Sequence, residues 1–154
     1  MTLETAEPLP SLYEIAQGVG ISSIVIHKVK TSTFEIEDIP DYLKVLVEIC
    51  NANDKIQKKS KKSVLKFQFK IVPGPSYWIN INKGLFTSGE GELDSPDVTI
   101  EMNKSIAAGI FTGEVNAASA YMSKQLRFIG PLRHGMKFQQ WTNTVKNELG
   151  LEQL

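Results

Sequence analysis

The sequence has one cysteine and no long apolar run, and each of these absences excludes a class of protein. Cys50 stands alone among 154 residues, so an internal disulfide is excluded and a reducing compartment is expected. No stretch approaches the roughly 18 apolar residues that a membrane-spanning helix needs. The first ten residues carry no basic side chain, which argues against a secretory signal. With 42% hydrophobic and 22% charged residues, the sequence predicts one globular, cytoplasmic domain.

Residues with catalytic or metal-binding chemistry are also few. The two histidines, His27 and His134, lie far in sequence from each other and from Cys50, so they make a poor metal-ligand set. The sequence contains no nucleophile elbow, phosphate-binding loop, dinucleotide-binding loop or zinc-protease motif. His134 is interpreted as a polar residue at a helix start, and residues 89–94 as an exposed acidic turn. The sequence therefore predicts neither an enzyme nor a bound metal or cofactor.

Charge is balanced overall, with 17 basic and 17 acidic side chains, which argues against a protein dedicated to nucleic acid. Its distribution is nevertheless uneven. Residues 55–70 hold seven lysines and no acid, and residues 90–101 hold five acids and no base. Two interpretations of the lysine run stay open: a solvated loop, or a transient contact for an anionic membrane surface. The densest part of the run contains Lys55, Lys58, Lys59, Lys61 and Lys62.

The spacing of apolar residues predicts the order of the elements. Alternation of apolar and polar residues predicts strands at 65–71, 77–81, 85–88, 98–102 and 125–129. Helical spacing predicts helices at 38–50, 103–111, 115–122 and 132–149. Nearer the start, a capping box at Ser11 predicts a short helix, and a β-branched run predicts a strand at 22–30. Residues 33–37 are expected to form a second strand or an extended lead-in.

This order predicts an α+β architecture, with a five-stranded, mostly antiparallel sheet and helices covering one face. We expect residues 65–102 to form a continuous antiparallel meander whose apolar side chains point toward the helices. These side chains are Phe67, Phe69, Tyr77, Ile79, Val98 and Ile100. The helix that begins after Asp38 has an unusually wide apolar stripe, which predicts either a helix nearly surrounded by protein or one with a second apolar neighbour.

From about residue 38 to residue 149, three segments in order resemble the type-2 sterol carrier protein family. The first is the hairpin stretch 77–84, Tyr-Trp-Ile-Asn-Ile-Asn-Lys-Gly, and the second is Asp-Val-Thr-Ile at 97–100. The third runs from the Ala-Tyr pair at 120–121 to Leu-Arg-Phe-Ile-Gly at 126–130. Asn80 stands where the family usually has an acid, and Ser123 where it usually has glycine. A parallel strand pair within 65–102 would count against the resemblance.

The resemblance implies an apolar tunnel between sheet and helices that binds a lipid or fatty acyl chain, with low head-group specificity and no catalysis. It divides the chain into an N-terminal extension, 1–37, and a lipid-binding domain, 38–150. Ala107 and Ala118 are expected as small residues of the tunnel wall. The larger candidate wall residues are Phe67, Phe69, Tyr77, Ile79, Val98, Ile100, Ile106, Ile110, Phe111, Tyr121, Met122, Phe128, Leu132, Met136 and Trp141.

An alternative function also stays open. In it the core is filled, and the domain is an accessory module that associates with a partner protein or a lipid-metabolising enzyme. The N-terminal extension would then serve as an interface, for instance of a homodimer. An exposed apolar patch on the extension would favour this alternative.

Overall fold

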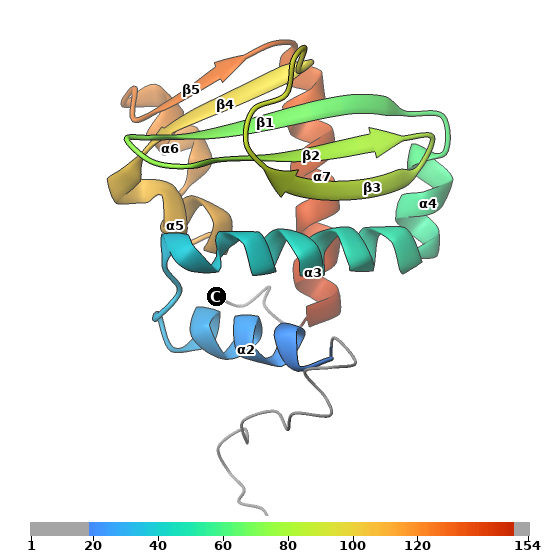
Figure 1. Ribbon diagram of the computed structural model, residues 1–154, viewed down its shortest axis with the longest axis horizontal. Coiled ribbons are helices and arrows are strands. Elements are labelled where there is room, and N and C mark those ends of the chain that lie inside the picture. Colours follow the sequence, from blue (N-terminus) through green and yellow to red (C-terminus); the bar gives the residue numbers. More distant parts are fainter. Residues whose placement is uncertain (1–18, 150–154) are drawn as a thin grey trace, which may run out of the picture.

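A computed structural model describes residues 19–149, and it has the predicted α+β architecture (Figure 1). The predicted helix at Ser11 lies outside the described residues. The elements, in chain order, are α2 (Val19–Lys30), the 3-10 turn η1 (Ile36–Asp38), α3 (Ile39–Ala52), α4 (Asp54–Ser60), β1 (Val64–Val72), β2 (Ser76–Asn82), β3 (Leu85–Glu90), β4 (Val98–Asn103), α5 (Lys104–Thr112), α6 (Ala117–Met122), β5 (Leu126–Ile129) and α7 (Leu132–Leu149).

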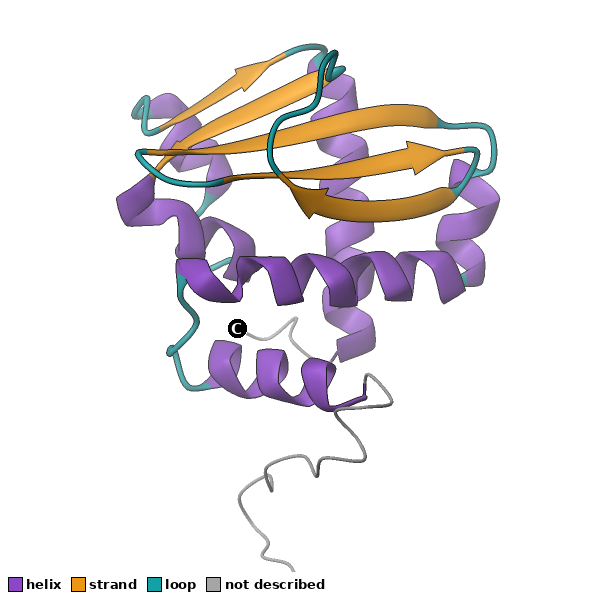
Figure 2. Cartoon of the chain, viewed as in Figure 1, coloured by secondary structure: helices purple, strands orange, loops and turns teal. Residues whose placement is uncertain are grey.

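The five strands form one mixed sheet in the order β3-β2-β1-β4-β5. Three neighbouring pairs are antiparallel, but β1 and β4 pair in parallel, with Phe67 opposite Val98. The expected continuous meander over 65–102 is therefore wrong at its last step. After β3 the chain crosses the outer face of the sheet and enters β4 beside β1, instead of turning back along β3 (Figure 2).

Gln68 fixes this crossover to the outer face of β1. Its side-chain Nε2 donates to the carbonyls of Tyr77 and Gly91, each at 2.9 Å, and its Oε1 accepts from the backbone N–H of Leu93 at 2.6 Å. Only 2% of Gln68 is exposed, although it points away from the helices. The crossover thus covers the middle of the outer face, and the buried Gln68 side chain forms hydrogen bonds with backbone groups on both sides of the contact.

Replacing Gln68 with leucine is expected to lower the free energy of unfolding by about 2 kcal/mol, because the substitution leaves buried backbone partners without hydrogen bonds. Urea denaturation measures the change. Lys66→Leu is the matched control, since Lys66 is on the same strand and face and uses only its backbone to contact the crossover. Equal losses in the two variants would contradict the role assigned to Gln68.

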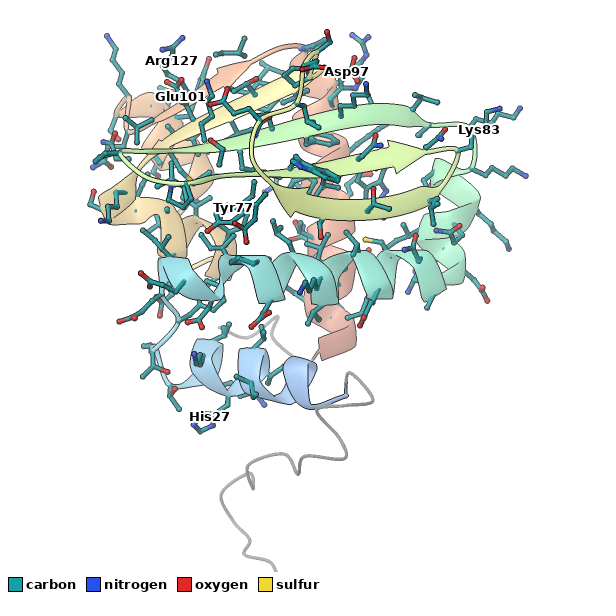
Figure 3. The ribbon with its side chains drawn as sticks, viewed as in Figure 1. His27, Tyr77, Lys83, Asp97, Glu101 and Arg127 are labelled. Atoms are coloured by element: carbon teal, nitrogen blue, oxygen red, sulfur yellow. The ribbon has the colours of Figure 1, made fainter. Side chains whose placement is uncertain are left out.

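The helices cover the other face of the sheet (Figure 2). All six side chains predicted to point toward them are buried, and cross-strand pairing places them on one face. Phe67 contacts the rings of Phe138 and Trp141 on α7, with ring centroids 5.2 and 6.5 Å apart. Tyr77 lies between the sheet and α3 (Figure 3). The apolar core is therefore the layer between this face and the helices.

The region 22–30 is helical, so its predicted strand is wrong. Val25 and Val29, one helical turn apart, are both buried, and α2 packs against α3. This packing outweighs the preference of β-branched residues for strands, which depends strongly on context. Residues 33–35 have no regular secondary structure, with Glu35 extended, and the short turn η1 follows, so no strand forms at 33–37. The second apolar neighbour predicted for α3 is α2.

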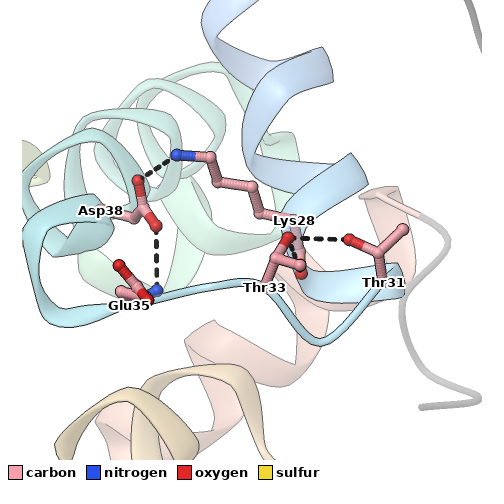
Figure 4. Close-up of polar contacts among 5 residues, drawn as sticks. All are labelled: Lys28, Thr31, Thr33, Glu35 and Asp38. Atoms are coloured by element: carbon pink, nitrogen blue, oxygen red, sulfur yellow. Dashed lines mark hydrogen bonds and ion pairs between the residues drawn. The ribbon is translucent and has the colours of Figure 1, made fainter.

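Asp38 joins α2 to the start of α3 (Figure 4). Its Oδ1 accepts from Lys28 Nζ at 2.6 Å, and its Oδ2 accepts from the backbone N–H of Glu35 at 2.9 Å. The hydrogen bond to Asp38 raises the pKa of Lys28. These contacts position α2 on the side of α3 that faces away from the sheet.

Candidate functional site

A cavity of about 520 Å³ lies between the sheet and helices α5, α6 and α7. This volume falls within the roughly 300–1,000 Å³ that is typical of small-molecule sites. Strands β1, β4 and β5 provide a mainly apolar floor: Phe69, Ile100, Met102, Leu126 and Phe128. The remaining walls come from α5, α6, the turn between them, and α7, with Tyr42 from α3. The cavity is therefore bounded by one edge of the sheet and the helices that follow it in sequence, and it is partly open to solvent.

The structure divides the fifteen candidate wall residues into two groups. Eight line the cavity: Phe69, Ile100, Ile110, Phe111, Tyr121, Phe128, Leu132 and Met136. Six belong to the buried core outside the cavity lining: Phe67, Tyr77, Ile79, Val98, Ile106 and Trp141. Met122 belongs to neither set, because 78% of it is exposed. Ala118 lines the cavity, whereas Ala107 is fully buried elsewhere.

The course of α7 explains this division. Trp141 and Val145 are buried, and Trp141 packs edge-on against Phe86 of β3, with centroids 5.3 Å apart. This contact closes the space above β3, at the side of the sheet away from the cavity. Leu132 and Met136, on another face of the same helix, line the cavity and are still largely exposed. They form part of its rim.

Two glycines bring the cavity walls close together. A Cβ atom on Gly135 of α7 would lie 2.6 Å from the Phe128 ring, so this glycine allows the ring to lie against the helix. Gly113 caps the C-terminus of α5 with φ of +88°, a conformation that favours glycine. The sequence carried no signal that Gly113 lines a cavity.

Polar residues of the lining were also missed by the sequence-based prediction. Asn116 precedes α6, and the others follow one face of α7. They are Gln139, Thr142, Asn143 and Lys146. Their spacing of three or four residues places them on one face of the helix. This signal was overlooked because the apolar residues of the same helix were used to assign its faces.

Among the described residues that line the cavity, Lys146 alone carries a formal charge. Desolvation by burial lowers the pKa of its ammonium group. Burial raises the pKa of Tyr42, whose ring packs edge-on against Phe34 and Phe111. His134 lies outside the lining, and burial together with nearby Arg133 and Lys137 lowers its pKa. The arrangement is that of an apolar binding space with one cation.

The lysine run lies elsewhere on the molecule. Helix α4 and the turn after it carry Lys55, Lys58, Lys59, Lys61 and Lys62, and all five are exposed. Most of the predicted loop is thus a helix, begun by Asn53, whose Oδ1 accepts from the N–H of Ile56. Helix α4 lies at the opposite end of the sheet from α5 and α6 (Figure 1). The lysines therefore do not border the cavity.

Within residues 19–149, no helix is long and apolar enough to cross a membrane. In the same range, no group of three or more histidine, cysteine, aspartate or glutamate side chains is arranged to hold a metal ion.

The mixed five-stranded sheet and its helices match the fold of solved sterol carrier protein structures. The match to the SCP-2 sterol transfer family covers residues 43–143, and the chain belongs to that family. No curated protein sequence matches the chain.

Solved structures show the same fold. The sterol carrier protein domain 2 of Helicoverpa armigera has a TM-score of 0.56 and 18% identity, over 69% of this chain and 86% of its own. Apo sterol carrier protein 2 of Yarrowia lipolytica has a TM-score of 0.57 and 14% identity, over 71% and 91%. We expected a parallel strand pair to contradict the resemblance. That expectation is wrong, because the family match holds with β1 and β4 paired in parallel.

Proposed function

We propose that this protein binds a lipid in the cavity, without catalysis, and carries it between sites. Membership of the SCP-2 family supports lipid binding in general. The observation that carries the proposal is the cavity of about 520 Å³ with its floor of Phe69, Ile100, Met102, Leu126 and Phe128. Each buried methylene contributes about 0.8 kcal/mol, so an acyl chain in such a space binds strongly through its tail.

Native mass spectrometry of gently purified protein tests the proposal. A co-purified lipid is expected as an added mass that organic solvent removes. Titration of the delipidated protein with a fluorescent fatty acid is then expected to saturate at one equivalent. Protein that carries no lipid, and shows no saturable uptake of any long-chain lipid, would overturn the proposal.

The alternative of an accessory domain has less support from the structure. An exposed apolar surface on the extension, residues 1–37, would favour it. Within the described part of that extension, Val25, Val29 and Phe34 are buried in the chain's own core. A homodimer through the extension stays a proposal, which sedimentation of the full chain would test. The proposed cytoplasmic location agrees with Cys50, a free and buried thiol.

We also propose that the lysines of α4 contact anionic membranes while the lipid is exchanged. Lys58 and Lys59 are exposed on the last turn of this helix. Changing both to alanine is expected to weaken binding to phosphatidylserine vesicles by about 2 kcal/mol, since each lysine near such a surface contributes about 1 kcal/mol. Added salt is expected to weaken the binding of the wild type to the same anionic vesicles. Equal binding to neutral and anionic vesicles, measured by co-sedimentation, would show that the run is a solvated helix only.

A further inference from the structure

One face of α7 changes in polarity along the length of the cavity. Near the start of the helix, Leu132 and Met136 line the cavity, with Gly135 between them. Further along, the lining residues of this face are Gln139, Thr142, Asn143 and Lys146. At 1.5 Å per residue, Leu132 and Lys146 are about 21 Å apart along the helix axis. The α7 side of the cavity therefore has an apolar end and a polar end, whereas Ile110, Phe111 and Val115 give α5 and the turn after it an apolar wall.

The polar end is closed by the turn after α5. A Cβ atom placed on Gly113 would lie 2.6 Å from Lys146 Nζ, so the ammonium group lies directly against this glycine. Lys146 is half-buried and lines the cavity. The position of Nζ is thus set by two elements, α7 and the C-terminal end of α5.

Lys146 lacks a carboxylate partner in the part of the chain that the structure describes. The described ion pairs involve Lys28, Lys70 and Arg127, and not Lys146. The lining contains no aspartate or glutamate. Burial alone shifts the pKa of Lys146 downward, with no contribution from an acidic side chain. A partly desolvated ammonium group without a counter-ion is costly, and an anion that reaches it recovers part of this cost.

We propose that the cavity selects lipids with an acidic head group, a carboxylate or a phosphate, and that Lys146 pairs with this group. The inference rests on the proposed function. The acyl chain lies over Phe69, Ile100 and Phe128, toward Leu132 and Met136, and the head group lies between Lys146 and Gly113. A neutral lipid of the same length fills the apolar end equally well and leaves Lys146 unpaired. Head-group specificity is therefore high, in contrast to the low specificity expected from the sequence.

The experiment compares three probes that share one tail: hexadecanoic acid, hexadecyl phosphate and hexadecanol. Each displaces a neutral fluorescent lipid from the full chain. Wild type is expected to bind the two anions about 10- to 100-fold more tightly than the alcohol. This is the ratio of affinities that a hydrogen bond to a charged group typically produces. Lys146→Met is expected to remove this preference and leave the alcohol affinity unchanged. The tighter of the two anions identifies whether a fatty acid or a phospholipid type of head group fits.

Two further variants separate the charge of Lys146 from other effects. Lys137→Met removes an exposed lysine of α7 outside the cavity lining and is expected to keep the preference. Lys146→Arg keeps the positive charge and is expected to retain most of the preference for the two anions. Equal binding of acid, phosphate and alcohol by wild type, or an unchanged preference in a folded Lys146→Met, would overturn this inference and leave lipid binding intact. Failure of all three probes with wild type would instead overturn the proposed function.

Discussion

Thr142→Trp is expected to weaken uptake of a fluorescent fatty acid roughly a hundredfold while the protein stays folded. Thr142 is half-buried and lines the cavity from α7. Its Oγ1 donates only to the carbonyl of Gln139 in the same helix, at 2.9 Å, so the substitution breaks no contact between elements. An indole in the cavity displaces about four methylenes of the ligand, which is about 3 kcal/mol of binding free energy.

Thr144→Trp is the matched control for this substitution. Thr144 is also half-buried, and its Oγ1 donates to the carbonyl of Gln140 at 3.1 Å, but it lies outside the cavity lining. We expect its fatty acid affinity to stay within about twofold of wild type. Titrations run beside thermal melts measure both properties. Normal uptake by a folded Thr142→Trp protein would show that lipid binds elsewhere.

Phe67→Ala is expected to lower the free energy of unfolding by about 3–5 kcal/mol. Phe67 is fully buried at the centre of β1, and its ring contacts Phe138 and Trp141 of α7. Small domains are stable by only about 5–15 kcal/mol, so this one contact between sheet and helix is a large part of the total. Urea denaturation followed by fluorescence measures the loss.

Tyr121→Ala provides the comparison for Phe67→Ala. Tyr121 is an aromatic residue too, but it lies at the cavity and is 47% exposed. Its removal is expected to change stability by about 0.5 kcal/mol, which is typical of a surface site. Similar losses in the two variants would mean that the rim of the cavity, and not only the layer beneath it, holds the fold together.

The strand pattern of this domain could be predicted from local sequence, whereas its connections could not. Alternation placed Phe67, Ile79 and Val98 on the buried face, because side chains alternate along any strand whatever its partner. The direction of pairing between β1 and β4 depends on the crossover after β3. The glycine and acidic residues of that crossover are as compatible with a hairpin turn as with a crossover. Gln68, which binds that crossover, has the same sequence pattern as an ordinary surface residue.

The helix α2 was mistaken for a strand for a related reason. Four β-branched residues within 24–29 favour a strand locally, and the helix forms because Val25 and Val29 are buried together with the residues of α3. The cavity lining could not be predicted from local sequence either. Phe67 and Phe69 have equal local patterns, yet the position of α7 places Phe67 in the filled core and Phe69 at the cavity.

The parallel pairing of β1 with β4 has a consequence for the order in which the sheet assembles. Strands β1, β2 and β3 are joined by short turns, so their contacts close small loops of chain. Val98 pairs with Phe67, 31 residues earlier, and this pairing closes a much larger loop at a greater cost in chain entropy. Since such non-local contacts slow folding, we expect the three-strand unit to form first and β4 to add later. The floor of the cavity, which needs β4 and β5, is then the last part of the sheet to be completed.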